Sequence, residues 1–397
     1  GGGYAYGSGS WPVYDGTSLA RKGDVVVVTV NHRLNVFGYL HLAEIAGEKY
    51  ARSGNAGMLD LVLALEWIRD NIESFGGDPD NVTIMGESGG GSKVSTLLAM
   101  PGAKGLFDKA IIQSGPGLTA TSAEQATENA RAILAELDID ENNLDALATL
   151  PADTILEATR VASEKAGGGF GGLRLAPVID GLSLLRHPFT PDAPIHSKNV
   201  PVMIGWNKDE MTIFNTTAPW FGTLTEQELA GRVTGMFGNN AADLLQAYRG
   251  MYPDYSPTYL FNMIMGDSRM FAGSVTLAER KVAQRGAPVY MYYLVWETPV
   301  GEGIFKSPHT LDMPFMFNNV DKATALTGES TEARKLEMQM SSAWIAFARN
   351  GNPNNSTVPH WPQYDANDRA TMVFDVKPRV ENDPKGSIRT LLERNAR

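Results

Sequence analysis

The chain has 397 residues, of which 43% are hydrophobic and 20% charged, and a formal net charge of −11, a composition typical of a globular protein with one large domain or two. The acidic balance argues against nucleic acid as a partner, because phosphate binding requires clustered Lys and Arg. The chain contains no cysteine, which excludes disulfides and thiolate chemistry, and it has no apolar run long enough to predict a membrane span.

Predicted strands and helices alternate along most of the chain. The run DVVVVTVN at 24–31 predicts a buried strand, and residues 56–72 carry apolar residues at helical spacing. Residues 81–87 predict a strand that leads into a helix at 89–100. Near-continuous apolar strands separated by helices predict an α/β fold, with a mostly parallel central sheet covered by helices on both faces. The later strands of this sheet are expected at 109–115, 200–206, 287–296 and 370–376.

Two helix-rich stretches interrupt this alternation, at about 122–165 and 225–285. We expect both to be insertions over the carboxyl edge of the sheet, within a single domain that spans 1–397. The glycine-rich segment 166–172 between them matches G-x-G-x-x-G, a pattern of dinucleotide sites. It follows a helix rather than a strand, so a flexible loop is the better interpretation.

The segment Gly86–Gly90 matches G-x-S-x-G at a predicted strand-to-helix junction. A sharp turn at such a junction strains the backbone of the serine and presents its hydroxyl above the edge of the sheet. Ser88 is therefore a candidate nucleophile. Because the chain has 41 glycines, the alternative is an ordinary polar residue in a glycine-rich turn.

A nucleophilic serine needs a base, and an acid behind that base. Of the six histidines, His309 is the best candidate, because it follows the expected strand 287–296 and so reaches the edge where Ser88 emerges. Asp209 and Glu210 follow the strand 200–206 in the same way, and the chain order serine, acid, histidine is that of α/β-hydrolases. Position alone does not choose between the two carboxylates, and a solvated surface pair is the alternative.

Eight stretches, spread over almost the whole chain, match the motifs of one enzyme family in that family's order. They are GGGYAYGS, VVVVTVNHRLNVFGYL, GNAGMLD, ALEWIRDNIESFGGDPDNVTIMGESGGGS, KAIIQSG, GWNKDE, PHTLDMPFMF and WIAFARNGNPN. The sequence thus resembles the type B carboxylesterases of the α/β-hydrolase fold, the family that also contains the cholinesterases. The resemblance implies that Ser88 is the nucleophile, Glu210 the acid and His309 the base.

The resemblance also implies roles for groups around this triad. Glu87 and Ser114 fall on positions where the family keeps polar side chains close to the catalytic residues. The glycines before Tyr4 imply an oxyanion loop, in which the amides of Gly2 and Gly3, with that of Gly89, point at the developing oxyanion. Such amides are oriented before the charge forms, and losing one costs on the order of 10²–10³ in rate.

The sequence departs from the family pattern at four points. Gly89 stands where alanine is usual, and Met211 and Thr310 stand where glycine usually follows the acid and the histidine. Family members also carry a segment before the oxyanion glycines, including the strand that leads into them. We therefore expect either a fragment of a longer protein or a short form, with a charged amino group on Gly1 beside the site.

Together these features predict a serine carboxylesterase that hydrolyses small carboxylic esters through an acyl-enzyme on Ser88. No ligand spacing suggests a metal, and no cofactor is expected. The alternatives are an amidase or lactonase that uses the same triad, and a non-catalytic scaffold protein of the same family. The sequence does not fix the preferred ester or the oligomeric state.

Four aromatic residues are candidates for lining an apolar substrate pocket, with a plain core role as the alternative: Phe170, Trp206, Phe214 and Trp220. The absence of cysteine contrasts with the disulfide-bonded animal cholinesterases and favours a bacterial esterase. The sequence does not choose between the cytoplasm and export.

Overall fold

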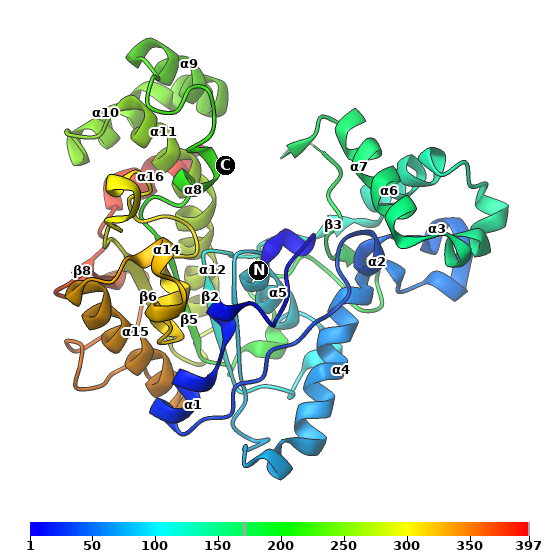
Figure 1. Cartoon of the computed structure of the whole chain (residues 1–397), viewed down its shortest axis with the longest axis horizontal. Coiled ribbons are helices and arrows are strands. Elements are labelled where there is room, and N and C mark those ends of the chain that lie inside the picture. Colours follow the sequence, from blue (N-terminus) through cyan, green and yellow to red (C-terminus); the bar gives the residue numbers. More distant parts are fainter. Residues whose placement is uncertain (170–171, 396–397) are drawn as a thin grey trace.

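The computed structural model describes residues 1–169 and 172–395, and it places a six-stranded sheet at the centre of the molecule (Figure 1). The strand order is β1-β2-β5-β6-β7-β8. The first five strands are parallel to their neighbours, and β8 pairs with β7 antiparallel. The strands are β1 (Thr83–Glu87), β2 (Lys109–Gln113), β5 (Val202–Asn207), β6 (Val289–Leu294), β7 (Ala370–Phe374) and β8 (Arg379–Asn382); a separate pair is formed by β3 (Thr121–Ser122) and β4 (Val178–Ile179). The predicted mostly parallel α/β sheet is confirmed.

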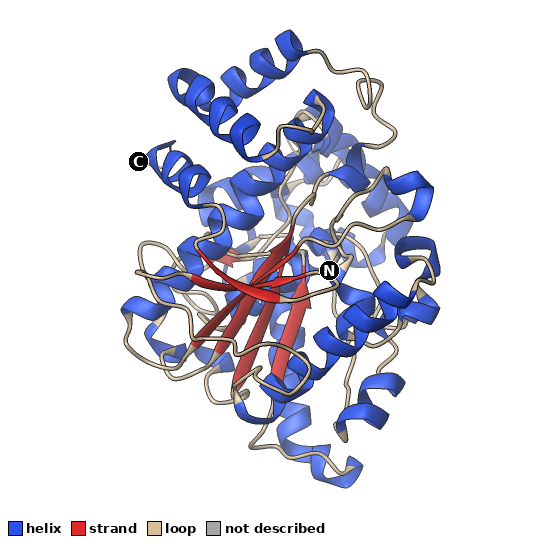
Figure 2. Cartoon of the chain, turned by 90° about the vertical axis from the view of Figure 1, so that its left-hand side faces the viewer, coloured by secondary structure: helices blue, strands red, loops and turns tan. Residues whose placement is uncertain are grey.

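Helices cover both faces of this sheet, as Figure 2 shows. Helices α5 and α12 contribute to the hydrophobic core on one face, and α13 and α15 contribute to the core on the other. The helices are α1 (Thr17–Gly23), α2 (Asn35–Tyr39), α3 (Ala43–Ala46), α4 (Ala56–Asn71), α5 (Gly89–Leu97), α6 (Ala123–Glu136), α7 (Ala152–Lys165), α8 (Thr212–Asn215), α9 (Glu226–Phe237), α10 (Ala241–Met251), α11 (Pro257–Gly266), α12 (Ala272–Ala283), α13 (Asp312–Met316), α14 (Thr324–Thr327), α15 (Thr331–Asn350) and α16 (Gly386–Asn395).

The apolar runs predicted to be strands have the pattern of strands buried on both sides. In β6, successive residues such as Met291 and Tyr292 belong to the cores on opposite faces, and every residue of the strand is buried. Because successive side chains of a strand point to opposite faces, a strand between two helical layers needs apolar residues at every position. This requirement explains why these runs could be recognised from the sequence.

The expected strand at 24–31 is wrong. The segment is extended, but it forms no ladder with any of the described residues, and Val26, Val28 and Val30 remain exposed. A cavity of about 620 Å³, lined by both this segment and β1, separates the two. The β-branched composition favours an extended backbone, but without a neighbour at hydrogen-bonding distance the segment cannot join the sheet.

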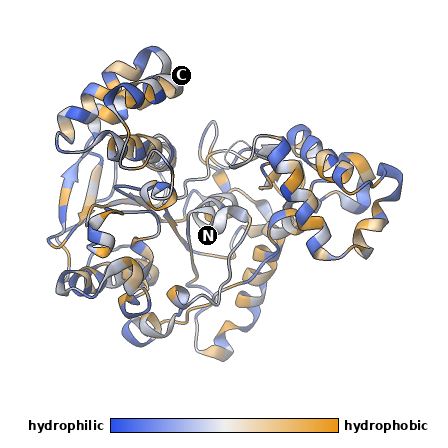
Figure 3. Cartoon of the chain, turned by 45° about the horizontal axis from the view of Figure 1, so that its top comes forward, coloured by the Kyte–Doolittle hydropathy of each residue, from blue (hydrophilic) through white to orange (hydrophobic). Residues whose placement is uncertain are grey.

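The two stretches predicted to be helical contain α6 and α7, and α9 to α12. Helices α6 and α7 pack beside α2 and α3 at the right of Figure 1, and residues of both colours alternate along this group in Figure 3, as expected of helices that bury one face. Helix α12 instead contacts β5 and β6, so the end of the second stretch belongs to the layer that covers the sheet. That both stretches are insertions into one domain remains a prediction. No helix within the described residues is long and apolar enough to cross a membrane.

Candidate active site

Ser88 occupies a sharp turn between β1 and α5. Its backbone has φ 59° and ψ −124°, a left-handed conformation that is costly for a residue with a side chain, and its N–H donates to the Gln113 carbonyl at 2.8 Å. A Cβ on Gly86 would lie 2.3 Å from the backbone of Gly90, so strand and helix approach this closely only because glycine stands there. The side chain of Ser88 is partly exposed. The geometry is that of a strained turn that presents a serine at the edge of a sheet.

Glu210 and His309 meet beyond the carboxyl ends of β5 and β6. Glu210 Oε2 lies 2.5 Å from His309 Nδ1, and both side chains are almost fully buried. The other carboxylate oxygen, Oε1, accepts the backbone N–H of Asn207 at 2.7 Å. A carboxylate held in this way fixes the orientation of the imidazole and its tautomer.

The other carboxylate candidate, Asp209, points away from His309. Its Oδ2 accepts the backbone N–H of Ser307 at 3.2 Å, and its own N–H donates to the Ser307 carbonyl at 2.8 Å. Burial raises the pKa of Asp209 to about 6. Asp209 therefore joins the loop after β5 to the loop that carries His309, while Glu210 faces the imidazole.

The second nitrogen of His309 faces Glu87. Nε2 lies 3.0 Å from Glu87 Oε1, so the ring is held between two buried carboxylates. Burial by itself lowers the pKa of His309, but the charges of Glu87 and Glu210 outweigh it and raise the pKa well above its usual value. The Glu87 contact was not foreseen beyond a general proximity, because residue types alone do not show which nitrogen a neighbour approaches.

Ser114 lies behind the serine turn. It is fully buried with φ 47°, and its N–H donates to the Gly205 carbonyl at 2.9 Å. Its hydroxyl has no hydrogen-bond partner among the described residues. The next residue, Gly115, passes so close that a Cβ there would lie 1.9 Å from the Ser88 carbonyl oxygen. Ser114 thus lies in the segment that packs directly behind Ser88.

The first residues of the chain lie against the start of α5. Gly2–Tyr4 forms a single 3₁₀ turn in which Gly2 and Gly3 have φ values of 75° and 58°. A Cβ on Gly89 would lie 2.6 Å from the Gly3 nitrogen, so this loop is packed directly on the residue after the serine. Tyr4 is buried and packs edge-on against Tyr39, with ring centroids 5.3 Å apart. Backbone amides of this loop therefore lie beside the serine turn.

The chain matches the model of the Carboxylesterase family over residues 1–389. The chain belongs to this family. It is 37% identical to the para-nitrobenzyl esterase of Bacillus subtilis, an alignment that covers 99% of this chain and 78% of that protein, and 31% identical to the phenmedipham hydrolase of Pseudarthrobacter oxydans, over 98% and 78%. The crystal structure of a carboxylesterase from Geobacillus stearothermophilus superposes with a TM-score of 0.85 at 38% identity, over 99% of this chain and 80% of that one. The fold is thus the α/β-hydrolase fold, and this carboxylesterase is a hydrolase of carboxylic esters.

The aromatic candidates of this carboxylesterase lie in different places. Trp206 is fully buried and packs on Phe271 and Tyr293, so it is a core residue. Phe214 is 49% exposed, and its ring centroid lies 5.3 Å from that of His309, so it flanks the site. Trp220 is partly buried among Phe221, Phe261 and Arg232, and Phe170 lies outside the described residues. Among the three described residues of this set, Phe214 is the one whose ring packs on His309.

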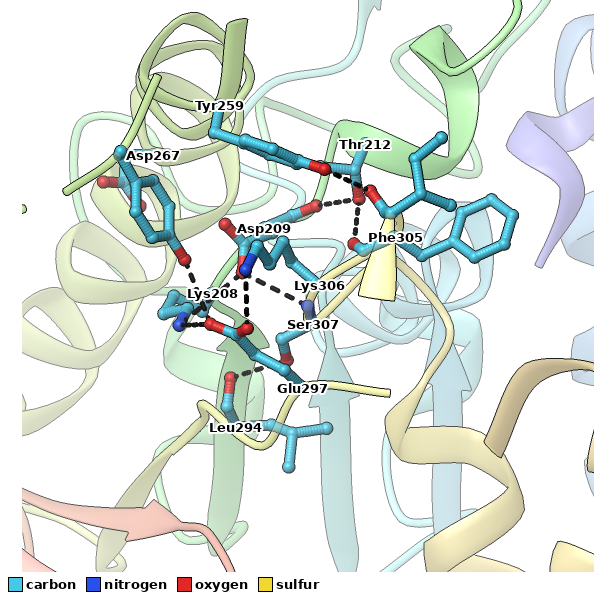
Figure 4. Close-up of polar contacts among 12 residues, drawn as sticks. Lys208, Asp209, Thr212, Tyr259, Asp267, Leu294, Glu297, Phe305, Lys306 and Ser307 are labelled. Carbon is cyan, nitrogen blue, oxygen red and sulfur yellow. Dashed lines mark hydrogen bonds and ion pairs between the residues drawn. The ribbon is translucent and has the colours of Figure 1, made fainter. Parts of the chain in front are cut away.

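A network of charged and polar side chains lies around Asp209 and Glu297 (Figure 4). The Glu297 carboxylate bridges Lys208 Nζ at 2.5 Å and Lys306 Nζ at 2.9 Å. The Ser307 hydroxyl donates to the Leu294 carbonyl at 3.1 Å, and the Tyr259 hydroxyl donates to the Ile304 carbonyl at 3.1 Å. Together with Asp209, these contacts tie the loops after β5 and β6 to α11. The sequence could have indicated this set only through the charges next to Glu210, which an exposed loop would also carry.

Proposed function

We propose that this carboxylesterase uses Ser88 as its nucleophile, His309 as its general base and Glu210 as the acid that orients His309. The observation that carries the proposal is the 2.5 Å contact between Glu210 Oε2 and His309 Nδ1 at the sheet edge where Ser88 occupies its strained turn. A buried carboxylate on Nδ1 leaves Nε2 as the nitrogen that can take a proton. This is the arrangement that a serine needs in order to act as a nucleophile.

The reaction then proceeds in two halves. Ser88 Oγ attacks the ester carbonyl carbon while His309 Nε2 takes its proton, and the negative charge forms on the carbonyl oxygen. The amides of Gly2, Gly3 and Gly89 stabilise that oxygen, and His309 returns the proton to the departing alcohol. A water molecule repeats the attack on the acyl-enzyme, which releases the carboxylic acid and restores Ser88.

Glu87 controls how much of His309 is available as a base. Because its carboxylate lies 3.0 Å from Nε2, it favours the protonated ring, which cannot accept the proton of Ser88. To act as the base, the neutral imidazole must direct the lone pair of Nε2 at Ser88 rather than at Glu87. The base therefore becomes active as the pH rises through the raised pKa of His309.

The proposed substrates are small-molecule esters with an apolar part that can rest on the half-exposed ring of Phe214. The name of one relative, a para-nitrobenzyl esterase, supports an aromatic group in the substrate. A series of p-nitrophenyl esters of increasing acyl length, measured with the parent and with Phe214→Ala, tests this. A larger KM for every ester of the variant supports contact with the alcohol part, and an unchanged KM contradicts it.

Intact-mass analysis after treatment with a phosphonate ester tests the triad directly. We expect one adduct, located on Ser88 by peptide mapping, and none in Ser88→Ala. The control is Ser342→Ala, which removes a partly exposed serine that donates to the Met338 carbonyl on α15. An adduct that persists in Ser88→Ala would show that another residue is the nucleophile.

A further inference from the structure

Lys93 is a buried lysine beside the proposed oxyanion loop. It belongs to α5, the helix that starts directly after Ser88, and only 4% of its surface is exposed. Its ammonium nitrogen lies 4.8 Å from the centroid of the Tyr4 ring and 3.4 Å from the Gly1 carbonyl oxygen. No ion pair joins it to a carboxylate within residues 1–169 and 172–395, and it lines the cavity of about 620 Å³ next to β1.

Such a position is unfavourable for a lysine. A buried ammonium loses its hydration, and without a carboxylate partner the loss is only partly offset. Burial accordingly lowers the pKa of Lys93 to about 8. The contacts that do hold the ammonium both belong to the segment Gly1–Tyr4, so this segment is what the charge acts on.

We propose that Lys93 is a positioning residue that holds the loop Gly1–Tyr4 over Gly89, through its contact with the Gly1 carbonyl and its position above the Tyr4 ring. The inference rests on the proposed function, because the amides of Gly2 and Gly3 matter only if they stabilise an oxyanion. Both contacts depend on the positive charge. A neutral amine has no cation–π attraction and donates a weaker hydrogen bond.

Between pH 7 and pH 9, Lys93 changes its charge while the titratable groups that face it keep theirs. Burial raises the pKa of Tyr4 to about 12, so that phenol stays neutral. Burial also lowers the pKa of His32, so this imidazole is mostly neutral in this range. A Cβ on Gly1 would lie 3.2 Å from Glu87 Oε2, so the Glu87 carboxylate is a neighbour of Gly1. A decline of activity above pH 8 therefore reports on Lys93.

The test compares Lys93→Arg, Lys93→Met and a matched control. Arginine keeps its charge at every accessible pH, so we expect Lys93→Arg to retain kcat at pH 7 within about threefold and to lose the decline above pH 8. We expect Lys93→Met to lower kcat at pH 7 by about tenfold with little change in KM, and to show no decline, because a misplaced donor affects the transition state more than the bound ester. A Lys93→Met variant with the parent's kcat and the parent's alkaline decline would overturn the proposal.

The control is Lys281→Met. Lys281 is also almost fully buried, burial also lowers its pKa to about 8, and it donates to the Lys198 carbonyl at 2.9 Å on a different part of the fold. This variant should change the melting temperature without changing the pH profile of kcat. An alkaline decline that disappears in Lys281→Met as well would assign it to general stability and would overturn the role of Lys93.

Hydrogen exchange separates this inference from the proposed function. If the parent protein hydrolyses no ester at any pH, the proposed function fails, and amide exchange of Gly2–Tyr4 at pH 7 then tests the loop alone. Faster exchange in Lys93→Met than in the parent and in Lys281→Met supports the anchoring of the loop. Equal exchange in all three overturns it.

Discussion

On one side of Ser88, Glu210 and His309 lie beyond the ends of two paired strands, β5 and β6, whereas on the other side the loop Gly1–Tyr4 rests on the start of α5. The first pair is fixed by hydrogen bonds between the two strands and between the loops that follow them. The loop is fixed by one buried ring, one lysine and close backbone contact at Gly89. A sheet sets the positions of side chains at its edge through its ladder, while a loop depends on each individual contact.

The same contrast extends below the site. The strands β2 and β5 are buried at every position, and each is paired on both sides. Within the described residues, β1 pairs only with β2, and the segment at 24–31 is separated from β1 by the cavity. Substitutions in these regions should therefore have effects of different size and kind. Those near His309 should change the chemistry, and those near Gly89 should change the geometry of the loop. Those along the segment at 24–31, called the open segment below, should have small effects.

The largest contrast is expected between two adjacent carboxylates. Glu210→Gln keeps the shape of the side chain but presents an amide to His309, which favours the wrong tautomer, and should lower kcat by about 10⁴-fold. Asp209→Asn keeps an acceptor for the Ser307 N–H and should lower kcat by less than about tenfold. Steady-state hydrolysis of a p-nitrophenyl ester measures both. Equal losses in the two variants would contradict the assignment of Glu210 as the acid.

The next largest effect is expected at Gly89. A Cβ there would lie 2.6 Å from the Gly3 nitrogen, so Gly89→Ala must displace the loop. We expect kcat to fall by about 10- to 100-fold, because the displaced loop weakens or removes one oxyanion donor. KM should be nearly unchanged. Gly231→Ala is the control, because a Cβ at that helical glycine meets no atom within 4 Å. Higher activity in Gly89→Ala would show that the loop has a better position than the one described.

A smaller effect, on pH dependence, is expected from Glu87→Gln. Of the two carboxylates that raise the pKa of His309, Glu87 has the larger Coulombic effect, so neutralising Glu87 lowers that pKa. The neutral base then exists at lower pH, and the acidic limb of the kcat/KM profile moves to lower pH. At pH values below the acidic limb of the parent's profile, Glu87→Gln should have the higher kcat/KM of the two proteins. A limb that stays in place would show that Glu87 does not face the ring during catalysis.

The sequence predicted the side of the site that the sheet carries better than the side that the loop carries. The apolar runs of β5 and β6 could be recognised because strands buried on both faces need apolar residues throughout, and this placed Glu210 and His309 at one edge. The choice of Glu210 over Asp209 needed the family resemblance, since both follow the same strand. Which atoms face each other, as Glu87 and His309 do, depends on side-chain directions that residue types do not encode.

The prediction of a strand at 24–31 was wrong because it rested on composition alone. The β-branched residues of this segment have the composition of a buried strand, but composition does not show whether a neighbouring strand lies within hydrogen-bonding distance. Lys93 was also missed, although a single lysine among the small and apolar residues of α5 is a visible signal. A charged residue in a predicted buried helix next to a candidate nucleophile is as strong a signal of a functional position as a histidine at a strand end.

The smallest effect is expected along the open segment, and it tests whether the cavity persists in solution. Val28 is 43% exposed, whereas Val202 in β5 is fully buried between two paired neighbours. Valine to threonine keeps the shape but replaces one methyl group with a hydroxyl, which costs free energy mainly where that group is removed from water. Val28→Thr should change the free energy of unfolding by less than about 0.5 kcal/mol, and Val202→Thr should lower it by about 1–3 kcal/mol, measured by urea denaturation. A loss at Val28 as large as that at Val202 would mean that the segment packs as tightly as an interior strand, and the contrast between the two sides of the sheet would then not hold.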